Sequence, residues 1–178
     1  MEEHLFWIAS RAAGIAALLL SSAAVGVGLT MGGRMVKGRG LDLRATHEAL
    51  SLATLIAIGV HAVALLGDSY LNSSVWDISI PFASGYKEPW MSIGIVAGWA
   101  LVALGVSYYS RTRIGVARWK KLHRWTALAW LAGIVHSLGE GTDAGTTWFL
   151  VCTAVAVVPP LVLLVVRHLP STPVPSRT

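Results

Sequence analysis

Charged residues are scarce in this chain. Only 13% of its 178 residues are Asp, Glu, Lys or Arg, whereas 54% are hydrophobic, and the mean hydropathy is +0.63. A soluble domain of this length needs far more charge on its surface. The shortage of charge therefore excludes an ordinary soluble protein and predicts an integral membrane protein.

Cysteine is nearly absent as well. The single thiol, Cys152, lies in an apolar run, so the chain cannot form an internal disulfide, a cysteine zinc site or an iron–sulfur cluster. A buried structural cysteine is the better interpretation. Acidic residues are missing from the middle of the apolar runs, which disfavours a di-metal carboxylate site.

Basic residues exceed acidic ones and give a net charge of +5. In a soluble protein this excess might point to nucleic acid. Here the Lys and Arg residues form short blocks between apolar runs, without interleaved aromatic residues that would stack on bases. We expect no nucleic-acid partner, and the blocks indicate membrane topology instead.

Five apolar segments are long enough to cross a hydrocarbon core of about 30 Å at 1.5 Å per helical residue. We predict an all-α integral membrane protein, a five-helix transmembrane bundle with spans at about residues 5–31, 45–67, 90–110, 120–139 and 148–166. We expect residues 1–169 to form one transmembrane domain and residues 170–178 to form a disordered cytoplasmic tail. Glu2, Glu3 and Arg11 argue against a cleaved signal peptide.

The connections between these segments alternate in charge. Residues 32–44 and 111–121 are rich in Lys and Arg, whereas residues 68–89 are nearly neutral and the last connection carries Glu140 and Asp143 without a base. By the positive-inside rule, the N-terminus lies outside and the C-terminus is cytoplasmic. The predicted location is the cell membrane, a bacterial inner membrane, with lipid as a direct partner.

Four histidines lie on two of the predicted spans. His47 and His61 are fourteen residues apart, about 21 Å along a helix, and His123 and His136 are thirteen apart, about 20 Å. Both helices enter from the cytoplasmic side, so His47 and His123 share an inner depth while His61 and His136 share an outer depth. Histidine is costly to bury in a membrane and usually faces a partner, a cavity or a cofactor.

Two stacked haems would suit this arrangement, each iron taking one imidazole from each helix. Haem held in this way transfers electrons, because no axial position is left for a substrate. A lone membrane histidine is also compatible with packing, a proton relay or another metal, but two depth-matched pairs favour haem. At about 100° per residue, thirteen residues turn His136 away from the face of His123. Either the helix is locally distorted or the haem planes are offset.

Other residues are candidates near these sites. Arg11 lies inside the first span, where it meets an outer haem propionate or reaches the headgroups. Arg44 and Arg124 adjoin the inner histidines and would meet an inner propionate or act only as topology signals. Trp130 lies midway between His123 and His136, where it packs or shortens the path between the haems.

Glycines Gly94 and Gly98 have a spacing that lets helices, or a flat cofactor, approach closely. Helix packing alone is the favoured interpretation.

These features resemble the ferric-reductase-like transmembrane domain family, which also forms the membrane half of NADPH oxidases. The resemblance rests on the two histidine spacings, with basic loops before both helices, and on four shorter motifs: Trp119-x3-His123, His136-x2-Gly139-x-Gly141-Thr142-Asp143, Trp7-x3-Arg11-x2-Gly14 and Ile80-Pro81-Phe82. It covers roughly residues 7–148. By this resemblance, His47, His61, His123 and His136 are the axial iron ligands of two b-type haems.

The chain departs from the animal oxidases, which have six spans and a C-terminal domain for flavin and NADPH. No G-x-G-x-x-G turn follows a strand-like segment here. Electrons would therefore come from a separate flavin- or NAD(P)H-dependent reductase, or from quinol.

The predicted function is a di-haem b-type cytochrome that moves electrons from a cytoplasmic-side donor to an outer acceptor, as an oxidoreductase or the electron-transfer subunit of one. One alternative is a quinol-linked haem anchor for a periplasmic reductase, with that reductase as redox partner. Another, from a different class, is a haem-free transporter or channel with histidine proton relays. A haem absorption spectrum separates the last from the other two.

Overall fold

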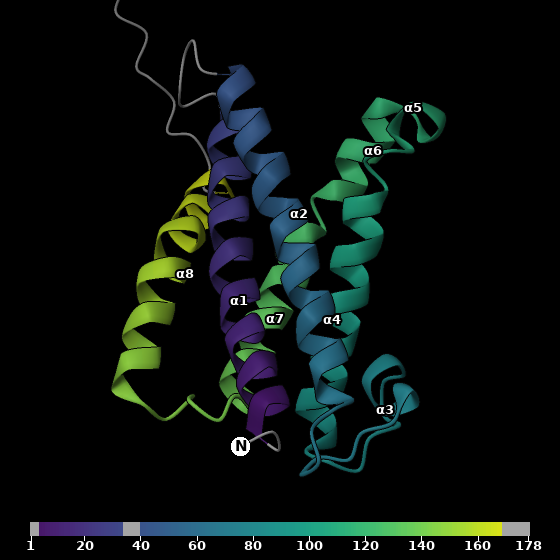
Figure 1. Cartoon of the computed structure of the whole chain (residues 1–178). Coiled ribbons are helices and arrows are strands. Elements are labelled where there is room, and N and C mark those ends of the chain that lie inside the picture. The colour runs from purple at the N-terminus through teal and green to yellow at the C-terminus, as the bar shows by residue number, and fades with distance from the viewer. Residues whose placement is uncertain (1–3, 34–39, 169–178) are drawn as a thin grey trace, which may run out of the picture.

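Helices are the only regular secondary structure in the described part of the chain. The computed structural model describes residues 4–33 and 40–168, so the predicted basic residues Arg34, Lys37 and Arg39 and the predicted tail, 170–178, lie outside the described residues. Figure 1 shows the elements, which are α1 (Leu5–Gly32), α2 (Gly40–Leu65), α3 (Val75–Ser79), α4 (Glu88–Val106), α5 (Arg111–Ile114), α6 (Val116–His123), α7 (Thr126–Glu140) and α8 (Thr147–His168).

Among the described residues, four helices are long and apolar enough to cross a membrane: Leu5–Gly32, Asp42–Leu65, Glu88–Val106 and Thr147–His168. They correspond to the first, second, third and fifth predicted spans. Large apolar side chains on these helices point away from the protein, for example Val155 at 71% exposure and Val63 at 64%. Such surfaces are stable in lipid and not in water, so the fold is that of an all-α, multi-pass membrane protein.

The fourth predicted span is divided. Residues 120–139 were expected to form one helix, but α6 ends at His123 and α7 begins at Thr126, with Arg124 and Trp125 between them. The 15 residues of α7 extend for only about 22 Å, less than the hydrocarbon core of about 30 Å. This segment therefore reaches the length of a span only together with part of α6.

Helix packing produces two closely associated pairs. Helix α1 packs along α2 and α4 packs along α7, while α8 and α7 lie against α1 (Figure 1). The buried core lies among α1, α7 and α8 and contains Leu18, Trp130, Ile134, Phe149 and Val157. Helices α2 and α7 thus face each other across the middle of the bundle, each held by a different partner.

Cys152 lies on α8 and is exposed at the protein surface. The prediction of a buried structural cysteine is wrong, because the apolar run that contains it turns this side chain away from the other helices. An apolar run in a membrane helix does not distinguish a lipid-facing side chain from one packed in the protein.

The connection between α2 and α4 folds back onto α4. Ser74 and Asp77 form a capping box at the start of α3. The indole N–H of Trp99 donates to the Ser79 carbonyl at 2.9 Å, and the Phe82 amide donates to Ser92 Oγ at 2.8 Å. These bonds fix the connection at the end of the bundle where the N-terminus also lies (Figure 1).

Candidate functional site

The four span histidines come together in two pairs. His47 on α2 faces His123 at the end of α6, with ring centroids 6.1 Å apart. His61 on α2 faces His136 on α7, with ring centroids 6.3 Å apart. These are the pairs that the sequence assigned to an inner and an outer depth, and we call them the inner pair and the outer pair.

The separation within each pair suits one metal ion between two imidazoles. A metal–imidazole bond is about 2 Å, and a ring nitrogen lies about 1.1 Å from the ring centre, so two trans imidazoles would have centroids about 6 Å apart. Both observed distances are close to this value. Among the described residues, no three His, Cys, Asp or Glu side chains gather as a metal ion without a macrocycle would need. A haem, whose macrocycle supplies the other iron ligands, would need only the two imidazoles of one pair.

Three of the four imidazoles are held by backbone carbonyls. His61 Nδ1 lies 2.8 Å from the Ser10 carbonyl, His47 Nδ1 lies 2.9 Å from the Ala24 carbonyl, and His136 Nδ1 lies 2.8 Å from the Trp90 carbonyl. A carbonyl oxygen only accepts, so Nδ1 carries the proton in each neutral ring. Nε2 then keeps its lone pair and is the nitrogen available to a metal.

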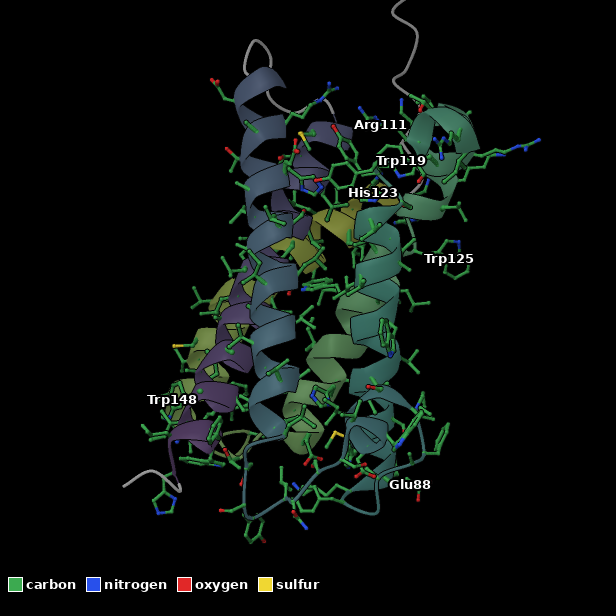
Figure 2. All side chains as sticks on the ribbon, turned by 45° about the vertical axis from the view of Figure 1, so that its right-hand side comes forward. Glu88, Arg111, Trp119, His123, Trp125 and Trp148 are labelled. Carbon is green, nitrogen blue, oxygen red and sulfur yellow. The ribbon has the colours of Figure 1, made fainter. Side chains whose placement is uncertain are left out.

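His123 is held differently, because it lies just before the break between α6 and α7. Its ring stacks on Trp119 with centroids 5.0 Å apart and planes 25° apart, and the Trp119 indole N–H donates to Ser107 Oγ at 3.2 Å. Figure 2 shows Trp119 and His123 at one end of the molecule, with Arg111 nearby. The break at Arg124 and Trp125 is the local distortion that brings His123 and His136 to the same side despite their thirteen-residue spacing.

A cavity of about 520 Å³ adjoins the outer pair. Its size lies within the roughly 300–1,000 Å³ of small-molecule sites. Apart from His61 and His136, its lining includes the glycines Gly14, Gly94 and Gly98, whose missing side chains make room, and the core residue Trp130. Gly94 and Gly98 differ in their neighbours, since a Cβ on Gly94 would meet His136 whereas one on Gly98 would meet Ile58.

The outer end of this cavity is polar. Arg11 Nε and Nη2 both donate to the carboxylate of Asp143, which is 6% exposed. The Arg11 guanidinium also lies 5.0 Å from the ring centre of Trp7. Arg11 therefore has an anionic partner within the protein, and its predicted contact with an outer propionate stays a prediction. Asp143 links the connection after α7 to α1.

Arg44 on α2 and Arg124 at the end of α6 are both exposed. Their predicted contacts with an inner propionate stay predictions. Trp130 is 1% exposed and its indole N–H donates to Ser22 Oγ at 3.0 Å, so it has a clear packing role between α7 and α1.

We expect the substitution Trp130→Phe to lower stability without altering electron transfer. It keeps a six-membered aromatic ring but deletes the N–H bonded to Ser22 and leaves a small cavity in the core, which together cost about 2–3 kcal/mol. The thermal midpoint in detergent and the rate of reduction by a chemical donor measure the two effects. Trp125→Phe is the matched control, since Trp125 is 61% exposed and projects outward in Figure 2. An unchanged midpoint with slower reduction would instead assign Trp130 to the electron path.

Sequence reasoning missed two features of this site. The first is the set of backbone carbonyls that hold the imidazoles. They have no signature in the sequence, because any residue type supplies a carbonyl. Ser10 and Ala24 are nevertheless fourteen residues apart, as are His47 and His61, and this shared period was a usable signal. The second is the pairing of Arg11 with Asp143, which connects positions 132 residues apart and left no local pattern.

Comparison with known proteins places this geometry in a family. The family model described as ferric reductase like transmembrane component matches residues 11–134, more than half of the chain. Searches of curated proteins and of solved structures gave no match. Members of this family generally bind haem and transfer electrons within the membrane. Three of the four paired histidines lie within the matched residues, and His136 lies two positions after their end. The chain belongs to the ferric reductase like transmembrane component family.

Proposed function

We propose that this protein is a di-haem b-type cytochrome that carries electrons from a cytoplasmic-side donor to an acceptor on the outer side. The observation that carries the proposal is the two facing imidazole pairs, with centroids 6.1 Å and 6.3 Å apart. His47 and His123 would hold the inner haem, and His61 and His136 the outer one. Family membership supports haem binding and membrane electron transfer in general.

Haem with two imidazole ligands supplies one-electron transfer without binding the acceptor at iron. The chain supplies the rest. Helix α2 holds one ligand at each depth, and four helical turns between His47 and His61 keep both on one face. The Nδ1–H bonds of three rings fix the tautomer and leave Nε2 of each ring as the nitrogen that would bind the iron. The surrounding apolar helices exclude water, which limits the rearrangement that each change of charge requires.

The proposed orientation places the inner pair near the cytoplasm. In its support, five exposed or half-buried basic residues lie on α5 and α6, beside His123: Arg111, Arg113, Arg118, Lys120 and Lys121. Asp143 and Glu140 lie at the other end with the outer pair. We infer five spans within a domain of residues 1–169, in which the end of α6 and α7 together form the fourth. The donor would be a separate flavin- or NAD(P)H-dependent reductase, or quinol.

The test is the absorption spectrum of the purified protein. We expect a dithionite-reduced minus oxidised spectrum with the α and Soret bands of a b-type cytochrome, and a haem-to-protein ratio near two. Absence of these bands would favour the haem-free proton-relay alternative and overturn the proposal. A ratio near one would leave a single histidine pair in use. Stable co-purification with a periplasmic reductase would identify the protein as its haem anchor.

A further inference from the structure

The three carbonyls that hold imidazoles share a feature of their helices. Each is followed four residues later by a glycine: Ser10 by Gly14, Ala24 by Gly28, and Trp90 by Gly94. In an α-helix the carbonyl of residue i lies beside the amide of residue i+4. A side chain at i+4 therefore stands next to the approach to that carbonyl, and glycine leaves the approach open.

The three glycines touch the rings themselves. A Cβ added to Gly94 would lie 2.5 Å from His136 Nδ1, one on Gly14 would lie 3.1 Å from His61 Nδ1, and one on Gly28 would lie 3.1 Å from His47 Cε1. The first distance is shorter than any real contact, and the other two are tight. We call each carbonyl and the glycine four residues after it a glycine notch.

The notches on α1 repeat with the period of the ligands on α2. Ser10 and Ala24 are fourteen residues apart, as are Gly14 and Gly28, and as are His47 and His61. Helices α1 and α2 are antiparallel neighbours. The notch at Ser10 therefore receives His61, and the notch at Ala24 receives His47. Fourteen residues return a helix to nearly the same face, so one surface of α1 serves both ligands.

Helix α4 supplies only one notch. It ends at Val106, and the residue fourteen positions after Gly94 is Tyr108. His123, which a second notch would have received, has a buried Nδ1 without a hydrogen-bond partner among the described residues. The outer pair therefore has two anchored imidazoles and the inner pair has one.

We propose that Gly14, Gly28 and Gly94 are positioning residues for the haem ligands, and that the missing fourth notch makes the two haem sites unequal. This inference rests on the proposed function. An imidazole that donates its Nδ1–H to a carbonyl is more basic at Nε2 and donates more strongly to iron, which favours the oxidised state. The outer haem, with two such ligands, has the lower midpoint potential, and disturbing one of its notches raises that potential.

The test is Gly94→Ala in the full-length protein. Because the added methyl occupies the place of the His136 ring, we expect the affinity for the outer haem to fall by roughly 10–100-fold. Haem-to-protein ratio, a redox titration and the low-spin EPR signals measure the effect. The outer haem is lost, or its midpoint potential rises and its EPR signal shifts, while the inner haem keeps its values.

Two glycines serve as matched controls. Gly26→Ala adds a methyl on α1 that would lie 3.7 Å from Pro160 on α8, and Gly145→Ala adds one in the connection after α7 with nothing within 4 Å; neither glycine lines the cavity. Both should keep two haems with wild-type potentials. Gly14→Ala is the milder second variant, for use if Gly94→Ala does not fold, and should raise the outer potential without removing the haem.

Two results are decisive against the inference. If the wild-type protein holds two haems but Gly94→Ala and Gly14→Ala match Gly26→Ala in ratio, potential and EPR signal, the notches do not position the ligands and the proposed function is unaffected. If the inner haem changes in place of the outer one, the assignment of notches to sites is wrong. A wild-type protein without haem would overturn the proposed function itself.

Discussion

Replacing His136 by alanine is expected to remove one haem and leave the other. His136 is the outer ligand on α7, and its ring faces His61 with centroids 6.3 Å apart. The inner pair lies toward the other end of the bundle, four helical turns away along α2, and shares neither ring with the outer pair. About half of the α-band absorbance should therefore remain in His136→Ala, and also in His61→Ala.

Two histidines outside the pairs are controls for this experiment. His4 precedes α1, and His168 ends α8, where its Nδ1 lies 2.8 Å from the Leu164 carbonyl. Substitution of either by alanine should leave the haem-to-protein ratio at the wild-type value. His47→Ala should remove the inner haem, with the outer spectrum retained. Loss of both haems in His136→Ala, with a protein that remains folded by circular dichroism, would show that the pairing by depth is wrong.

The pairing of the histidines was accessible from the sequence because two periodicities coincide. His47 and His61 repeat after four helical turns, and His123 and His136 after nearly the same distance, so depth alone assigns the partners. The sequence also raised the question of how a thirteen-residue spacing presents two ligands on one side. It did not contain the answer, since the break at Arg124 and Trp125 carries no glycine or proline.

Long-range partners were not accessible in the same way. A hydropathy pattern places a residue within a membrane segment but does not say which side of the helix faces lipid, and this is why Cys152 was misplaced. The anchoring of His47 depends on the carbonyl of Ala24 and on the gap at Gly28, neither of which has a chemical signature of its own. Only the fourteen-residue spacing of Gly14 and Gly28 on α1, compared with the same spacing of the histidines on α2, would have indicated these two features.

Removing the charge of Asp143 is expected to have the largest effect on stability among single polar substitutions. Asp143 is 6% exposed and accepts two hydrogen bonds from Arg11, whose side chain is 35% exposed. Breaking a fully buried pair costs roughly 3–5 kcal/mol, and the partial exposure of Arg11 reduces this to about 2–3 kcal/mol for Asp143→Asn. The thermal midpoint in detergent should fall accordingly, because an uncompensated guanidinium remains at the polar end of the cavity.

A double-mutant cycle separates the ion pair from a local effect on the connection between α7 and α8. Arg11→Gln alone should also destabilise, and the double variant Arg11→Gln/Asp143→Asn should be more stable than the sum of the two single effects implies. Glu88→Gln is the control, since this exposed carboxylate lies in the first turn of α4 and its loss costs only about 0.5 kcal/mol. Strict additivity of the two single effects would show that Arg11 and Asp143 contribute independently. In that case Arg11 would be free to bind an outer propionate. Its contribution to binding of the outer haem would then be measured by how much more of that haem is lost in Arg11→Gln than in Asp143→Asn.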